Sequence, residues 1–300
     1  MRKLVFAAWF GVLGPAILAL AGCSSQPETP PLDVAAYTAS VEQWREARAE
    51  NLVTEDGWTT LVGLHWLREG DNSVGSSADS VVQLPESAPA HVGTVTLTDG
   101  KAHFTPAPGI DLPDTDLIQD SVPDYTVLRL GTVRFYLIER GGAYGIRIKD
   151  ENAPARVEFH GLTWYPVDPN WVVQGRFIPD PHTIRYATEA GVNEVYPSPG
   201  FVEFEHDGKS YRLETADEEG ELFYVISDET SGKTTYPAAR FIYGDMPRER
   251  ELDAPVTIDF NKAYNPPCVF TDYATCPLPP PDNRLTFPVE AGEKTYVRNY

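Results

Sequence analysis

Tight Gly-containing turns between short apolar segments constrain the fold of this chain more than any other feature. Asp99-Gly100, Gly141-Gly142 and Asp207-Gly208 each separate two segments in which apolar and polar residues alternate. Such dipeptides favour two-residue hairpin turns, because these turns need positive φ angles that Gly and Asp adopt at low cost. The pattern predicts antiparallel hairpins and an all-β body, either a single β-sandwich or a partly open barrel.

One helix and one irregular segment interrupt this pattern. Residues 33–51 are predicted to be helical, because Tyr37, Val41 and Trp44 recur at three- and four-residue spacing. The proline-rich residues 106–123 are either a long loop between sheets or a boundary between two parts of the body. We expect residues 33–300 to form one mostly-β domain with an N-terminal helix and a long, proline-braced C-terminal segment.

The N-terminus has the composition of a bacterial lipoprotein leader. Arg2 and Lys3 precede an apolar run over residues 4–20, and Leu20-Ala21-Gly22-Cys23 resembles the lipobox. Residues 1–22 are then a signal peptide that is removed. Cys23 would carry the acyl chains that anchor the protein in a lipid bilayer. The alternative is an ordinary cleaved signal peptide with an incidental cysteine.

The residues after Cys23 indicate where the protein is located. Ser24 stands where inner-membrane lipoproteins carry a retaining Asp, which favours the outer membrane, facing the periplasm. Residues 23–32 are polar and proline-rich, as is typical of an extended tether without a core. We therefore expect a membrane-anchored lipoprotein of the cell envelope.

Charge and missing motifs disfavour several functional classes. The formal net charge of −20 repels phosphate backbones, so we expect no nucleic-acid partner. The sequence contains no G-x-S-x-G, no S-x-x-K and no glycine-rich phosphate loop. These absences weaken the common hydrolase and nucleotide-binding interpretations, and no cofactor is predicted.

Residues 256–294 contain both cysteines outside the leader, Cys268 and Cys276. In the periplasm a disulfide is the default, and a loop this short contributes about 2.5 kcal/mol in the chain-entropy model if its geometry permits the bond. Two buried free thiols or a reactive thiol pair are the alternatives. The C-x7-C spacing is not that of a zinc finger and no His lies nearby, so no metal site is predicted.

Prolines make the same segment stiff, and polar side chains accompany them. Pro266-Pro267 and the run that ends at Pro281 hold the backbone extended, which would lower the ordering cost of a binding site. Equally, Asn and Arg side chains often satisfy the backbone groups of a long irregular segment. Both interpretations stay open. The candidate ligand-binding or catalytic residues are Asn261, Tyr264, Asn265, Tyr273, Asn283 and Arg284.

A second polar group follows a predicted strand near residue 150. Asp150, Arg156 and His160 are secondary candidates, because a carboxylate pair in the turn at residues 149–154 could perform acid–base chemistry. The alternative is that these residues form a turn and carry solvated charges.

Three stretches of the sequence, taken in order, resemble the bacterial and archaeal family called domain of unknown function 1684. They are GWTTLVGLHWLREGDNSVGS (57–76), RIKDENAPARVEFHGLTWYPVD (147–168) and DFNKAYNPPCVFTDYATCPLPPPDNRLTFPVEAGEK (259–294). The resemblance runs from about Tyr37 to Tyr296. The family has no assigned activity, so the resemblance implies an organisation of the chain and no function.

Two functions remain after these arguments. The first is a lipid-anchored periplasmic β domain that binds a small polar ligand or a partner in the envelope. The alternative is a hydrolytic enzyme that uses the polar cluster of the C-terminal segment. A deep polar pocket with a buried Asp or His near Asn265 and Arg284 would favour the enzyme, and a shallow aromatic patch would favour the binding domain.

The lipid anchor predicts where a cysteine variant fractionates. Cys23→Ser removes the acylated side chain, so the variant should move from the membrane fraction to the soluble periplasm. Sedimentation and immunoblotting of cell fractions measure this, with Ser25→Ala as a control that stays with the membranes. Sedimentation of Cys23→Ser with membranes in high salt would contradict the anchor.

Overall fold

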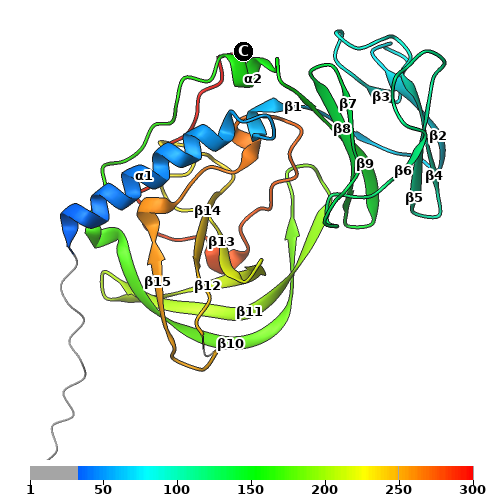
Figure 1. The fold of residues 1–300 in the computed structure, drawn as a ribbon. Coiled ribbons are helices and arrows are strands. Elements are labelled where there is room, and N and C mark those ends of the chain that lie inside the picture. The colour runs from blue at the N-terminus through cyan, green and yellow to red at the C-terminus, as the bar shows by residue number, and fades with distance from the viewer. Residues whose placement is uncertain (1–32, 249, 300) are drawn as a thin grey trace, which may run out of the picture. The chain divides into compact units, whose positions relative to one another are not determined.

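A computed structural model describes residues 33–248 and 250–299 of the chain (Figure 1). The predicted signal peptide, Cys23 and the tether lie outside the described residues. The chain from Val34 onward forms one compact unit. Among the residues described, no helix is both long enough and apolar enough to cross a membrane.

The N-terminal helix α1 (Val34–Leu52) matches the helix predicted over residues 33–51. It packs through Val41, which is fully buried, and through Trp44, whose ring meets the edge of Trp164 at 5.7 Å between centroids. The remaining helical elements are single turns. They are α2 (Pro154–Val157), η1 (Trp58–Thr60), η2 (Pro169–Trp171), η3 (Phe260–Lys262), η4 (Pro267–Val269) and η5 (Pro281–Asn283).

Strands form a much larger share of the described chain than helices do and pair into three sheets, which confirms the predicted all-β class. A four-stranded sheet has the order β1 (Leu61–Trp66), β9 (Ala143–Asp150), β8 (Val133–Arg140), β7 (Val127–Leu130). A five-stranded sheet has the order β3 (Val82–Gln83), β2 (Gly70–Gly75), β4 (Gly93–Thr98), β5 (Lys101–Pro106), β6 (Thr115–Leu117). A six-stranded sheet has the order β14 (Arg240–Asp245), β13 (Glu221–Ile226), β12 (Lys209–Glu218), β11 (Asn193–His206), β10 (Val172–Ala187), β15 (Pro255–Asp259).

The predicted turns connect antiparallel neighbours in each sheet. Asp99 and Gly100 have φ angles of 49° and 76° and join β4 to β5. Gly141 and Gly142, at 59° and 88°, join β8 to β9. Asp207-Gly208 joins β11 to β12 with φ angles of 48° and 69°. Paired positive φ angles match the right-handed twist of the flanking strands, so these dipeptides fix the hairpin registers.

The two smaller sheets form a sandwich around one core. Phe104 of β5 and Phe135 of β8 are both fully buried, and their rings meet at 5.8 Å between centroids. The proline-rich residues 106–123 run between these sheets and contribute β6, which pairs with β5. The sandwich alternative of the sequence analysis therefore describes this part of the chain.

The six-stranded sheet forms a nearly closed barrel-like body, because its long strands β10 and β11 curve strongly (Figure 1). Its interior is apolar and includes Phe177, Leu213, Tyr224 and Ile258, all fully buried. The barrel alternative describes this part, so the body contains both predicted architectures.

The C-terminal segment after β15 packs against the barrel-like sheet. Arg240 of β14 is buried and pairs with the buried carboxylate of Asp228 at 2.8 Å. The Arg240 guanidinium also donates to the carbonyls of Val289 and Ala291. An unpaired buried guanidinium would be costly, so these carbonyls fix the path of the segment.

Candidate functional site

A cavity of about 980 Å³ lies among α1, the β8–β9 turn, strands β11 to β14 and the C-terminal segment. Its volume is in the range of ligand sites in proteins, which are lined mainly by apolar and aromatic groups with a few placed polar groups. Its aromatic lining consists of Trp44, Trp58, Tyr196, Phe223, Phe241, Tyr243, Tyr264 and Phe270, and its ionisable lining includes Arg48, Asp120, Glu139, Arg140, Arg147, Glu194, Glu218 and Lys262.

A fully buried carboxylate, that of Glu293, holds one side of this cavity together. The Nε of Arg48, on α1, donates to its Oε2 at 2.6 Å. Asn265 donates to the same carboxylate through its backbone N (3.3 Å) and its Nδ2 (2.8 Å). Arg48 Nη2 also donates to the Asn265 carbonyl at 2.9 Å, so the helix and the C-terminal segment are joined at this point.

Asn265 leaves one buried acceptor without a partner. Its Nδ2 donates to Glu293 and, at 2.7 Å, to the carbonyl of Lys294, which fixes the orientation of the side-chain amide. Its Oδ1 is buried and accepts no hydrogen bond from any described residue. Buried acceptors in proteins are nearly always satisfied, so this oxygen is an exception within a residue of the cavity lining.

Glu218 supplies a carboxylate to the same cavity. The Tyr243 hydroxyl donates to its Oε2 at 2.6 Å, and no described cation forms an ion pair with it. Burial raises the pKa of the Glu218 carboxyl; the Tyr243 hydrogen bond opposes this shift, and the charges of Glu219, Glu194 and Glu221 add to it. Burial and Glu218 also raise the pKa of Tyr243, which stays protonated and keeps donating.

A second polar group in the lining is largely self-paired. Arg140 donates to both carboxylate oxygens of Asp120, at 2.8 and 2.7 Å, and its Nε lies 3.3 Å from Glu194. Glu194 also accepts from Tyr196 at 2.9 Å and from Thr275 at 2.8 Å. These carboxylates are thus neutralised within the cavity wall.

Arg147 is the less satisfied cation of this group. It is buried in the cavity lining, and its Nη1 lies 3.6 Å from Asp120. Its guanidinium lies over the Trp58 ring, 5.3 Å from the centroid. Its Nε has no hydrogen-bond partner among the described residues. Two lining residues, Asn265 and Arg147, thus each have one buried polar atom without a partner among the described residues.

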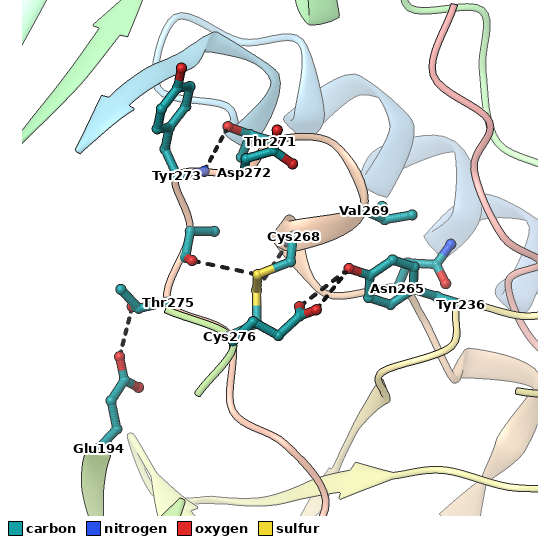
Figure 2. The surroundings of a disulfide bond; sticks show 12 residues. Glu194, Tyr236, Asn265, Cys268, Val269, Thr271, Asp272, Tyr273, Thr275 and Cys276 are labelled. Atoms are coloured by element: carbon teal, nitrogen blue, oxygen red, sulfur yellow. Dashed lines mark hydrogen bonds between the residues drawn. A yellow bond between two sulfur atoms is a disulfide. The ribbon is translucent and has the colours of Figure 1, made fainter. Parts of the chain in front are cut away.

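The two cysteines of the C-terminal segment form a disulfide beside the cavity. Cys268 and Cys276 have Cα atoms 6.1 Å apart, within the usual range for a disulfide. Figure 2 shows the loop that the bond closes, with Thr275 directed at Glu194. Glu189 lies close enough to complete a three-residue metal site, but both sulfur atoms are already used by the disulfide.

The structure divides the six candidate residues of this segment into three groups. Tyr264 and Asn265 line the cavity. Asn261 and Asn283 are fully buried and serve as internal connectors. Tyr273 and Arg284 are exposed and lie outside the cavity lining. The candidates are therefore not brought together in one cavity.

The two connector asparagines use their side chains completely. Asn261 Nδ2 donates to the Tyr37 hydroxyl and the Asp168 carbonyl, both at 2.9 Å, and its Oδ1 accepts from Asp168 N at 3.0 Å. Asn283 Oδ1 accepts from Glu214 N at 2.7 Å, and its Nδ2 donates to the carbonyls of Glu214 (2.9 Å) and Val225 (3.0 Å). Both amides donate both hydrogens within the protein, are fully buried and lie outside the cavity lining, so neither is placed to bind a ligand there.

The secondary candidates also lie outside the cavity lining. Asp150 accepts from Asn152 N at 2.9 Å and so stabilises its own turn. Arg156 donates to two carbonyls, those of Val53 and Glu151. His160 stacks on Tyr296 at 4.8 Å between ring centroids. Each of these three side chains is engaged in local structure.

Glu218, Tyr243, Arg147 and Glu194 were not among the candidates from the sequence. Glu218 belongs to the acidic turn region Asp217-Glu218-Glu219-Gly220-Glu221, which has the composition of a solvated hairpin end. The alternation of Phe241 and Tyr243 could have indicated the cavity wall from the sequence, because it places two aromatic rings on one face of β14.

Residues 157–294 match the family described as protein of unknown function, DUF1684. The chain carries a domain of this family. The DUF1684 match covers the barrel-like sheet and the C-terminal segment as far as Lys294, whereas the resemblance in the sequence extends from about Tyr37 to Tyr296. Helix α1 and the sandwich therefore lie outside the matched residues.

One similar solved structure is the solution NMR structure of an uncharacterized protein from gene locus rrnAC0354 of Haloarcula marismortui. It is 32% identical, with the alignment covering 47% of this chain and 79% of that chain at a TM-score of 0.40. The comparison with curated proteins finds no match.

Two adjacent residues of the DUF1684 domain should respond very differently to truncation. Asn283→Ala leaves buried backbone groups of Glu214 and Val225 unpaired, at about 1–3 kcal/mol each, so unfolding should become easier by about 3 kcal/mol. Arg284→Ala removes one contact to the Pro279 carbonyl at 3.5 Å and should change stability by less than about 0.5 kcal/mol. Urea denaturation measures both, and equal losses in the two variants would contradict the assignment.

Proposed function

We propose that this domain binds a small polar ligand in the cavity, as a lipid-anchored protein of the cell envelope. The observation that carries the binding proposal is the cavity of about 980 Å³ itself, because its lining combines eight aromatic side chains with several ionisable ones. Its volume would accommodate a small polar ligand.

The anchoring part of the proposal has a different basis. It rests on the Leu20–Cys23 sequence, which lies outside the described residues, and on the polar residues that follow. Anchoring at the outer membrane would present the cavity to periplasmic solutes, and the net charge of −20 disfavours nucleic acid as a partner.

The alternative of a hydrolytic enzyme has less support. It relied on the polar cluster of the C-terminal segment, yet Asn261 and Asn283 spend their hydrogen bonds on the backbone and on Tyr37. Arg284 and Tyr273 are exposed outside the cavity. Only Tyr264 and Asn265 of that cluster remain for a ligand, which supports binding.

Blocking the cavity should abolish ligand stabilisation. Ala47 is exposed on α1 and belongs to the cavity lining, so Ala47→Trp fills the cavity without crowding the core. Gln43→Trp, exposed on the same helix but outside the lining, is the matched control. The measurement is the melting temperature in the presence of amines, amino acids, organic acids and sugars.

At least one of these compound classes should raise the melting temperature of the wild type and of Gln43→Trp, and not that of Ala47→Trp. Saturating ligand stabilises a folded protein by about 2.7 kcal/mol at one hundred times its Kd, which is readily detected as a shift. No shift with any class, or the same shift in Ala47→Trp, would contradict the proposed function.

A further inference from the structure

Glu218 is a carboxylate in the cavity lining without a cationic partner. Its hydrogen bond comes from Tyr243, and none of the ion pairs among the described residues includes it. The other cations of the lining are engaged elsewhere. Arg48 pairs with Glu293, Arg140 and Arg147 lie against Asp120, and Lys262 lies 4.0 Å from Asp259. A charge on Glu218 thus has no counterion among the residues that the structure describes.

The groups around Glu218 make the local potential more negative. Glu221 lies directly opposite it across the β12–β13 pair, and like charges in that position repel. The charges of Glu219 and Glu194, like that of Glu221, raise the pKa of the Glu218 carboxyl. A cation brought into this part of the cavity would be attracted by Glu218 and by the nearby carboxylates of Glu219 and Glu221.

Aromatic faces surround the same position. Phe223 packs against Tyr243 and Phe241, with ring centroids 5.0 Å apart in both pairs. Tyr264 stacks with Tyr243 at 6.3 Å, and Tyr196 meets Phe223 at 6.3 Å. All five rings line the cavity. The faces of aromatic rings attract cations, most strongly where water is excluded.

The acceptors of this region call for hydrogen-bond donors. Glu218 accepts one hydrogen bond, from Tyr243, and a carboxylate has acceptor capacity for more. A quaternary ammonium has no N–H to donate, whereas a primary ammonium has three. The Glu218 carboxylate and the ring faces together fit a cation that carries N–H groups.

On the basis of the proposed function, we propose that the cavity binds a small organic primary amine whose ammonium group pairs with the Glu218 carboxylate. The aromatic walls pack against the hydrocarbon part of the amine.

The pairing makes binding depend on pH. Burial raises the pKa of the Glu218 carboxyl, so this group loses its charge at a higher pH than an exposed glutamate. An ammonium favours the charged carboxylate, so amine affinity is full above that pKa and falls as the pH drops through it. The groups that face Glu218 are Tyr243, Tyr264 and Tyr196, which stay neutral over this range, and the carboxylates Glu194, Glu219 and Glu221.

Calorimetric titration with 1-aminobutane tests the proposal, with tetramethylammonium and butanoate as comparison probes. Wild-type protein should bind 1-aminobutane more tightly than either comparison probe, with an affinity that falls under acidic conditions. Glu218→Gln should lose more than about tenfold in affinity, because it removes a charge-assisted hydrogen bond. Glu205→Gln, at an exposed position of β11 outside the lining, changes the net charge equally and should bind nearly as the wild type does.

The other possible results of the titration overturn different parts of the proposal. Unchanged affinity in Glu218→Gln, or stronger binding of butanoate or tetramethylammonium, overturns the amine assignment while leaving a ligand in the cavity. Absence of binding by all three probes, with no melting shift from any compound class, overturns the proposed function as well. If the affinity of the wild type for 1-aminobutane is no lower under acidic conditions, the pairing with Glu218 is wrong. This test needs no variant.

Discussion

The buried carboxylate of Glu293 is the interaction on which the cavity depends. It receives hydrogen bonds from Arg48 on α1 and from the backbone and side chain of Asn265. Helix α1 begins the described chain and Glu293 lies near its end, so this carboxylate closes a contact between elements about 245 residues apart. A buried ion pair is tolerated only when its remaining hydrogen-bonding capacity is filled, and Asn265 helps to fill it.

The same contact explains why a polar group remains free. Asn265 directs both hydrogens of its amide to Glu293 and to the Lys294 carbonyl, which turns its Oδ1 away from these partners. The asparagine that secures the C-terminal segment therefore keeps a buried acceptor without a partner among the described residues. Asn261 and Asn283, in contrast, are satisfied on every side and only hold the segment in place.

Local turn chemistry made the architecture predictable from sequence. Asp99-Gly100 and Asp207-Gly208 fix hairpins because few other dipeptides adopt two successive positive φ angles, and the period of α1 identified its helix. The coexistence of a sandwich and a barrel-like sheet was not predictable, because it depends on which strands pair across long separations. Strand β15 pairs with β10, for example, after four intervening strands.

The site was less predictable, for a related reason. Asn265 and Asn283 have the same side chain in the same proline-braced segment, and only the surrounding backbone determines which of them retains a free acceptor. Glu218 looks like a solvated turn residue until β14 brings Tyr243 beside it. Sequence alone reveals which residues are polar, whereas the pairing of distant strands decides which ones share a cavity.

The effect of Glu293→Gln on the free energy of unfolding tests this account most directly. Removing one charge of a buried pair leaves the Arg48 guanidinium poorly compensated, so the account predicts a loss of about 3 kcal/mol in urea denaturation. Glu290→Gln, at an exposed position three residues earlier, removes an equal charge and should leave stability unchanged to within about 0.5 kcal/mol. Equal stability of Glu293→Gln and the wild type would contradict the claim that this carboxylate joins α1 to the C-terminal segment.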